Sequence, residues 1–349
     1  MITSLFFKES LTDGTYKANS PSPMNMKKLT IGQRIFLGVL LWIIFISGLH
    51  SWRNGELFAS NVLRVGFVPI TCHLLCPVTY ELNKDIPFKP IKFTAWPEMC
   101  EALKSGELDM AFILAPLAIM LNAQGFPIKL VMLGHRNGTG LMVRKDAENA
   151  DLNWLEHKTI AIPIRFSNQY LTLLDLLDEA HIPESSIKLV EMPPPDMPSS
   201  LAMGAVDAYI VGEPYAAAGE LNGAGQILYL MKDIRPGFIS SVLVVREDVL
   251  KKRKKDLQRL IQAFYKNGAW IEAHRKEAAA IGAAFYRLPN ALIEHVLLSQ
   301  PDRVLYNDLL PRKQEIEAMA ASMQKRGLLK GNFDVNAFLD TSMIPEVSR

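Results

Sequence analysis

Residues 106–116 read GELDMAFILAP, and residues 204–214 read GAVDAYIVGEP. Both segments follow one pattern: glycine, two residues, aspartate, six residues and proline. The apolar run after each aspartate is typical of a strand that is buried in a parallel sheet. The closing proline suits the first turn of a helix, where a backbone N–H is not needed. The chain therefore predicts the same strand–helix unit twice.

The repetition extends on both sides of these segments. A short apolar run that ends in proline precedes each of them, VLRVGFVP at residues 62–69 and TIAIP at residues 159–163. A third pair follows, LMVRKD at residues 141–146 and LVVRED at residues 243–248. Three landmarks in the same order predict strands that alternate with helices, twice over. We expect an α/β protein of two doubly wound lobes with parallel sheets.

The lobe boundaries follow from that duplication. The chain crosses between the lobes near NGTG at residues 137–140 and PGF at residues 236–238, where glycines allow the backbone to change direction. The C-terminal part reads as mostly helical, with no further strand, and we expect it to pack on lobe one. Lobe one is predicted at residues 62–140 and 237–349, and lobe two at residues 141–236.

An apolar segment precedes the two lobes. Residues 35–50 read IFLGVLLWIIFISGLH and follow Lys27, Lys28 and Arg34, which is the order of charged and apolar residues in an export signal. The run is shorter than the roughly 20 residues of a spanning helix, which is typical of a cleaved signal. With its flanking residues it is long enough to be an uncleaved anchor. A buried core helix is a third reading. Residues 1–34 are predicted to be a disordered leader. Because positive charges stay in the cytoplasm, both export readings place the lobes outside it.

The composition excludes several classes of protein. The chain has 38 Lys and Arg residues and 36 Asp and Glu residues, a net charge of +2. It therefore lacks the concentrated basic charge of nucleic-acid binders. The basic run at residues 251–255 reads as a solvated helix face. Apolar residues make up 49%, which argues against disorder. Cys72, His73 and Cys76 lack a fourth ligand nearby, so no metal site is predicted.

Ligands of open α/β sheets bind beyond the carboxyl ends of the strands, against the free N–H groups of helix N-termini. Two facing lobes form a cleft at this edge, and hinges close it. The pattern brings ten predicted ligand-binding residues there: Thr71, His73, Trp96, Pro116, Thr139, Arg165, Ser167, Asn168, Glu213 and Tyr215.

Several of these residues also have a purely structural reading. Ser167 and Asn168 suit a helix cap, and His73 reads equally as a cap. Trp96 reads equally as a core residue, and Glu213 as a charge at a helix N-terminus. The chain has no nucleophile elbow, phosphate loop or dinucleotide fingerprint, so we expect no catalytic residue and no cofactor.

Five segments together resemble the nitrate/sulfonate/bicarbonate-type substrate-binding proteins of ABC transporters, a family that includes binders of taurine and thiamine pyrimidine precursors. The resemblance covers about residues 62–270. The segments are Val65-Gly66-Phe67-Val68-Pro69, Trp96-Pro97, Gly106-Glu107-Leu108-Asp109, Leu114-Ala115-Pro116 and Gly212-Glu213-Pro214-Tyr215. The resemblance implies a periplasmic-binding-protein type II fold, with two lobes, two hinge crossings and the ligand between them.

Two positions of the family's site differ in this chain. The histidine that begins the first helix of lobe two in nitrate and bicarbonate binders is replaced by Ser167-Asn168-Gln169. The glutamine before the hinge looks replaced by Thr139. Bare nitrate is therefore disfavoured. We expect an oxyanion or carbonyl head near Thr71 and Ser167 with Arg165 as charge partner, and a body against aromatic rings.

The leading hypothesis is an extracytoplasmic solute-binding protein of an ABC importer, not an enzyme. It would capture a small organic anion or related polar molecule and deliver it to a permease. The expected location is the periplasm, either free or anchored to the inner membrane through the N-terminal segment. The alternatives are an enzyme on the same fold, for pyrimidine precursor synthesis or chorismate dehydration, and a membrane-anchored ligand sensor.

Overall fold

The computed structural model describes residues 30–59, 62–147, 149–300 and 302–345, with the backbone alone for residues 50–59. The chain forms two units, Met1–Ser60 and Asn61–Arg349. Residues 1–29 of the predicted leader lie outside the described residues.

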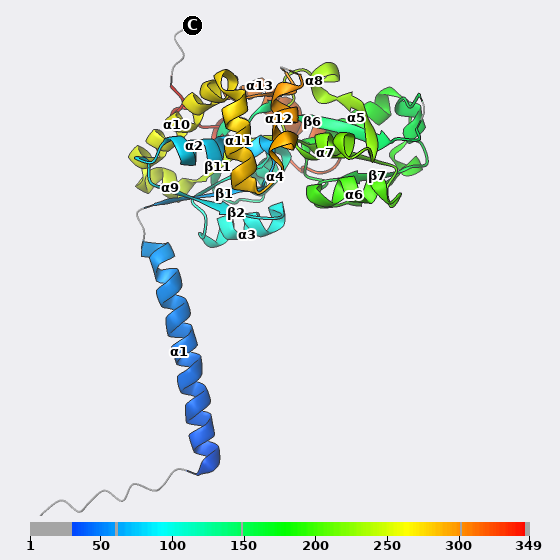
Figure 1. The fold of residues 1–349 in the computed structure, drawn as a ribbon. Helices are drawn as coiled ribbons and strands as arrows, with labels where there is room; N and C mark the ends of the chain where they lie inside the picture. The colour runs from blue at the N-terminus through cyan, green and yellow to red at the C-terminus, as the bar shows by residue number, and fades with distance from the viewer. Residues whose placement is uncertain (1–29, 60–61, 148, 301, 346–349) are drawn as a thin grey trace, which may run out of the picture. The chain divides into compact units, whose positions relative to one another are not determined.

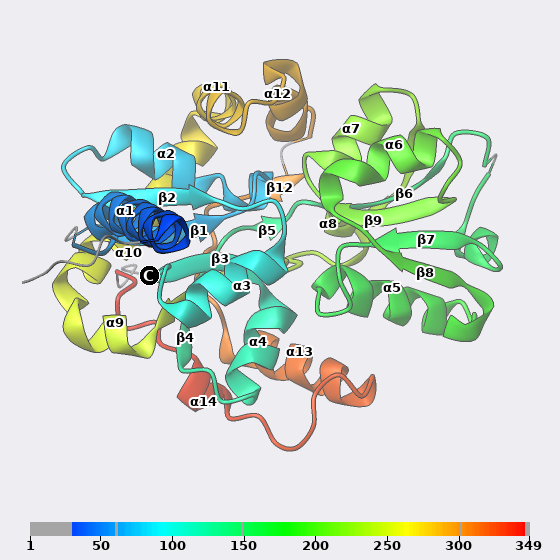
Figure 2. The same ribbon diagram turned by 90° about the horizontal axis from the view of Figure 1, so that it is seen from below.

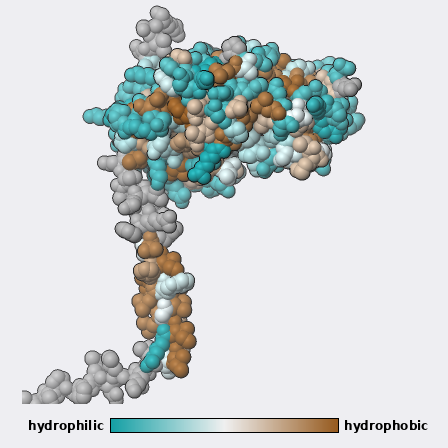
Figure 3. Space-filling model, viewed as in Figure 1, coloured by the Kyte–Doolittle hydropathy of each residue, from teal (hydrophilic) through white to brown (hydrophobic). Residues whose placement is uncertain are grey.

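The N-terminal unit is one helix, α1 (Ile31–Ala59), which begins four residues before the predicted apolar run. Its part Ile31–Leu49 has a mean hydropathy of 1.8 and is long and apolar enough to cross a membrane. The side chains of this part are exposed in the described structure, and Figure 3 shows apolar residues on the face in view. The segment therefore suits an anchor or a signal.

The larger unit contains two five-stranded sheets, which Figure 1 shows with helices around them. The first sheet has the order β2-β1-β3-β11-β4 and the second has the order β10-β6-β9-β7-β8. The strands of the first sheet are β1 (Leu63–Phe67), β2 (Phe88–Lys92), β3 (Met110–Leu114), β4 (Ile128–Leu133) and β11 (Ser241–Arg246). The strands of the second are β6 (Thr139–Arg144), β7 (Thr159–Ile162), β8 (Lys188–Glu191), β9 (Ala208–Gly212) and β10 (Gly225–Leu230).

Helices connect the strands of each sheet. Gly106 ends the helix before β3 with a φ of 84°, a left-handed conformation that glycine adopts without strain. The helices of lobe one are α2 (Leu75–Leu82), α3 (Trp96–Ser105) and α4 (Ala115–Ala123). Those of lobe two are α5 (Asn168–Glu179), α6 (Met197–Ala202), α7 (Tyr215–Leu221) and α8 (Met231–Ile234).

The aspartate of each repeated segment has the same structural role. Asp109 accepts hydrogen bonds from the backbone N–H of Arg64 (2.8 Å) and from its guanidinium. Asp207 accepts a hydrogen bond from the backbone N–H of Thr159 (2.9 Å). Arg64 and Thr159 stand at the start of the neighbouring parallel strands β1 and β7. Each aspartate therefore ties its own strand to its neighbour at the amino edge of the sheet.

The sheets are mixed, which corrects the expectation of parallel sheets. β11 runs antiparallel to β3 and β4, and β6 runs antiparallel to β9 and β10. Both reversed strands directly follow a crossing between the lobes, so each enters its sheet from the opposite direction. The third landmark of each repeated unit thus lies in the sheet of the other lobe.

The C-terminal region contacts both lobes. A short strand, β12 (Val304–Leu305), pairs with β5 (Arg136–Asn137) at the first crossing, so the expectation of no further strand is wrong. Figure 2 shows β5 and β12 between the two sheets. α12 packs against α7 of lobe two, and α13 packs against α4 and α5. The helices here are α9 (Glu247–Lys252), α10 (Lys254–Ala273), α11 (Arg275–Tyr286), α12 (Asn290–Leu298), α13 (Lys313–Lys325) and α14 (Val335–Phe338).

Candidate functional site

The two lobes meet at the carboxyl ends of their strands and are joined by direct hydrogen bonds. In lobe one, the N–H and Oγ1 of Thr71 both donate to the carbonyl oxygen of Glu213, at 2.9 Å each. In return, the hydroxyl of Tyr215 donates to the carbonyl oxygen of Pro69 (3.3 Å). Three of the predicted ligand-binding residues, Thr71, Glu213 and Tyr215, therefore hold the lobes together in this structure.

The Glu213 carboxylate forms an ion pair with Arg303, a residue that the sequence did not indicate. The Nε of Arg303 donates to Oε1 of Glu213 (2.7 Å), and the backbone N–H of Ala217 donates to Oε2 (2.9 Å). Both side chains of this ion pair are buried. Arg303 also donates to Glu220, an acid that is partly exposed. Glu213 therefore joins the C-terminal region to lobe two.

Polar side chains at the crossings bind one another. Gln169, which is not among the ten predicted ligand-binding residues, donates from Nε2 to the hydroxyls of Ser240 (2.8 Å) and Thr139 (3.3 Å). Asn168 donates to the carbonyl oxygen of Ile239 (2.6 Å). Thr139 and Asn168 thus contact the crossing segments, which makes them part of the hinge in this arrangement.

Two predicted residues have roles inside their own helices. Ser167 is the N-cap of α5, because its Oγ accepts the N–H of Tyr170 (3.1 Å) and donates to the carbonyl of Ile164 (2.7 Å). Pro116 lies buried in the first turn of α4. Both positions follow the helix-start chemistry that the sequence predicted.

His73 lies in the core of lobe one rather than at its surface. It is fully buried, its Nδ1 accepts the N–H of Val68 (2.9 Å), and its ring lies 5.5 Å from that of Phe112. Its Nε2 has no hydrogen-bond partner among the described residues. Burial, aided by the nearby His135, lowers the pKa of His73 to about 3, so the ring is neutral.

The buried neutral ring of His73 predicts a loss of stability in acid. The unfolded chain takes up a proton at this residue below about pH 6.5, whereas the folded chain does so only near pH 3. As the pH is lowered between these values, each such histidine lowers the free energy of unfolding by about 1.4 kcal/mol per pH unit. We expect His73→Asn to flatten this slope in urea denaturation, since the amide can keep the bond to Val68. The exposed His181→Asn leaves the slope unchanged, and an equal slope in both variants contradicts the account.

Arg165 is half-exposed and has acidic partners. Its Nη1 donates to the hydroxyl of Tyr170 (2.9 Å) and lies 3.5 Å from Oε1 of Glu184. Its Nε lies 3.6 Å from Oε1 of Glu191. The expected charge partner of an anion is therefore already placed between two carboxylates.

One cavity lies between the lobes at the carboxyl ends of the strands. It has a volume of about 180 Å³. Trp96 is the one predicted ligand-binding residue among the described residues that line it, and its indole Nε1, though buried, has no partner among those residues. The cavity is lined by Ala95, Trp96 and Pro97 of lobe one and by Pro163, Ile164, Glu191, Met192, Pro193 and Pro194 of lobe two.

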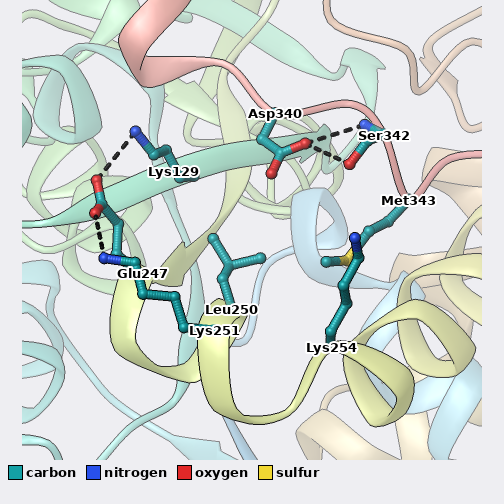
Figure 4. Close-up of a pocket in the computed structure, with 8 residues that line it drawn as sticks. All are labelled: Lys129, Glu247, Leu250, Lys251, Lys254, Asp340, Ser342 and Met343. Carbon is teal, nitrogen blue, oxygen red and sulfur yellow. Dashed lines mark hydrogen bonds and ion pairs between the residues drawn. The ribbon is translucent and has the colours of Figure 1, made fainter.

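Two larger cavities lie elsewhere. One, of about 330 Å³, lies between α5, the second crossing and α13 and includes Asn168. The other, of about 340 Å³, lies on lobe one beside α9 and the amino end of β4. Figure 4 shows its Lys129 and Lys251 paired with Glu247. This cavity beside α9 thus lies at the edge of the sheet opposite to the interlobe cavity, and its Glu247 pairs with two of its three lysines.

The three cysteines are free and buried. Burial raises the pKa of the Cys72 and Cys76 thiols, and it raises that of Cys100 to about 12, so they stay protonated. In the part of the chain that the structure describes, no three His, Cys, Asp or Glu side chains gather to hold a metal ion.

Known proteins share this sequence and fold. A family model described as the NMT1-like family matches residues 59–285. The nitrate import ATP-binding protein NrtC of Synechocystis is 27% identical over 243 residues, 62% of this chain and 36% of the relative. The chain thus spans about a third of that relative's length. An aliphatic sulfonates-binding protein of Bacillus subtilis is 24% identical over 240 residues, 67% of this chain and 71% of the relative.

A solved structure agrees with the sequence comparison. The ligand-binding component of an ABC-type import system from Staphylococcus aureus, solved with zinc bound, is 27% identical. It superposes with a TM-score of 0.75 over 83% of this chain and 100% of that one. The predicted fold class, a periplasmic-binding-protein type II fold with two α/β lobes, is confirmed.

Proposed function

The chain belongs to the NMT1-like family, and from that premise we propose that it is an extracytoplasmic solute-binding protein of an ABC importer. The resemblance stated from the sequence is confirmed at the level of the family. The proposed role is to capture a small organic molecule between the lobes and to present it to a permease.

The observation that carries this proposal is the interlobe cavity. It lies at the carboxyl ends of β2, β7 and β8, where α/β sheets bind ligands, and both lobes supply its walls. A wall from each lobe means that a bound solute favours the closed arrangement over an open one. The apolar lining supports an organic solute over a bare inorganic anion such as nitrate.

Binding without catalysis is part of the proposal. Glu191 is the one ionisable side chain among the described residues that line the cavity, and no nucleophile stands beside it. Glycoside- or acyl-transfer chemistry needs a second group as acid, base or nucleophile. The named relatives are transport components, which points in the same direction.

We further propose that α1 tethers the lobes to the inner membrane on its outer side. Ile31–Leu49 is 19 residues long, close to the roughly 20 that a span requires. Lys27 and Lys28 stand before it and Arg34 lies in its first turn, which favours a cytoplasmic N-terminus. A tethered lobe pair stays close to the permease that receives its solute.

The full chain, purified from bacterial membranes in mild detergent, tests these proposals. We expect native mass spectrometry to find one small organic molecule per chain, unchanged after incubation. We also expect protease to digest the lobes in spheroplasts, and cells that lack the chain to take up less of the identified molecule. Conversion of the molecule would support the enzyme reading, and unchanged uptake with altered gene expression the sensor reading. A full-length chain found in the cytoplasm contradicts the location.

A further inference from the structure

We propose that lobe one docks on anionic phospholipid headgroups through a basic edge, formed by Lys251, Lys252, Lys254 and Lys255 at the junction of α9 and α10. This inference rests on the proposed tether α1 and adds to it an electrostatic contact with the same membrane. The sequence alone favours a solvated helix face for residues 251–255. The place of these lysines in the fold and the short chain that leads to α1 point to a membrane surface.

The basic edge lies at the amino end of the first sheet. The last residue of β11, Arg246, directly precedes α9 and donates its backbone N–H to the carbonyl oxygen of Asp109, just before β3 (3.2 Å). Asp109 in turn accepts the backbone N–H of Arg64, at the start of β1 (2.8 Å). α9 therefore begins at the same edge of the sheet as β1, the strand that follows the tether. The interlobe cavity lies at the opposite, carboxyl edge.

The chain between α1 and this edge is short. Three residues, 60–62, separate Ala59, the last of α1, from Leu63, the first of β1. An extended chain covers at most about 3.6 Å per residue, so this step spans at most about 14 Å. Ten residues of α1 follow Leu49, the end of the apolar segment, and a helix of that length rises by about 15 Å. An inserted α1 therefore keeps the start of β1 within about 30 Å of the hydrocarbon, which raises the effective concentration of lobe one at that surface.

The exposed charge of the basic edge is positive. Lys254 and Lys255 are exposed and have no ion-pair partner among the described residues. The other two lysines lie 3.7 Å from acids one turn earlier in α9, and their side chains are 78% and 75% exposed. Residues 246–256 read REDVLKKRKKD, an excess of three positive charges. In the adjoining cavity, Lys129 and Asp340 cancel each other in charge, so the excess remains.

An anionic lipid surface matches this edge. Each lysine or arginine close to such a surface is attracted to it, and the attraction fades within a Debye length, about 8 Å at physiological salt. The long lysine side chains reach into the headgroup layer with their ammonium groups still in water, so the desolvation cost is small. A tether that already holds the lobe nearby makes a weak attraction sufficient. Docking at this edge leaves the interlobe cavity, at the opposite edge, open to solute.

Lysine labelling of the full chain in lipid nanodiscs tests the proposal. One set of discs contains phosphatidylcholine alone, and the other contains phosphatidylcholine mixed with phosphatidylglycerol. We expect a soluble acetylating reagent, followed by mass spectrometry, to modify the basic edge about fivefold more slowly in the anionic discs. This difference disappears at about 1 M salt, where the Debye length is about 3 Å. Lys145 and Lys188, exposed lysines of lobe two, react equally in both discs and serve as internal controls.

Matched double variants identify the residues that dock. Lys254→Gln combined with Lys255→Gln removes two charges and keeps both side chains polar. We expect the slowing at the other two lysines of the basic edge to shrink to under about twofold. Lys145→Gln combined with Lys188→Gln removes the same charge from lobe two, and the full slowing remains.

The other outcomes overturn the inference and separate its causes. Equal labelling of the basic edge in both discs excludes lipid docking, and equal slowing of the lobe-two lysines excludes a specific edge. Slowing in native membranes alone assigns the edge to a membrane protein, and slowing by free glycerophosphoglycerol in neutral discs assigns it to a soluble phosphate. A chain that enters neither disc contradicts the tether. A chain that enters the discs without slowing, yet carries its co-purified molecule, contradicts the docking alone and leaves the proposed solute binding in place.

Discussion

Replacing Arg303 with methionine lowers the free energy of unfolding by about 3–5 kcal/mol, the usual cost of breaking a buried ion pair on one side. The Glu213 carboxylate is fully buried, and without Arg303 its described partners reduce to the N–H of Ala217. A buried charge that has lost its counter-charge is far less stable than the same charge in water. Urea denaturation of the full chain in mild detergent measures the change.

Two further variants make this prediction specific. Arg303→Met combined with Glu213→Gln removes both charges, and we expect it to recover most of the loss, because a neutral pair carries no buried charge. Lys84→Met breaks the exposed pair with Glu81, in which both side chains are more than half exposed, and costs under about 1 kcal/mol. The account is wrong if Arg303→Met and Lys84→Met lower the stability equally.

Replacing Trp96 with alanine weakens the binding of the co-purified solute by about 30-fold or more, the effect of truncating a central aromatic anchor. The side chain is the one aromatic group among the described residues that line the cavity. Trp154→Ala serves as the control, since this tryptophan packs in lobe two against Lys158, away from the cavity. Calorimetric titration of the three proteins tests the prediction, and equal affinities would exclude Trp96 from the site.

Much of the fold could be predicted from the two repeated segments. The spacing of Gly106, Asp109 and Pro116 reflects a left-handed cap, a carboxylate that binds the neighbouring strand, and a helix start. The cap and the helix start are met within a few residues of chain, and the aspartate directly precedes its strand, so the pattern records all three although the bonded strand lies 45 residues away. The direction of β6 and β11 depends on which lobe the strand enters after a crossing, and the local sequence does not encode that choice.

The site was harder to predict, because its residues meet across long stretches of the chain that no local pattern connects. Trp96 is predicted at the cleft because the proline after it fixes a strand-to-helix turn. Arg303 lies 90 residues from Glu213, and no spacing rule connects them. Pro163 and the segment after β8 line the cavity through apolar surfaces, which resemble core residues in a sequence. His73 lies in the core of lobe one, and the sequence left its position open, because a histidine beside two cysteines reads the same whether it faces a cleft or the core.

The central claim is that the solute binds between the lobes against Trp96. A crystal structure of the full chain, purified with its solute bound, tests this most directly. The account predicts density for one small organic molecule in the cavity between Trp96 and the Pro163–Ile164 turn. Density in the lysine-lined cavity beside α9, with the interlobe cavity empty, would contradict it.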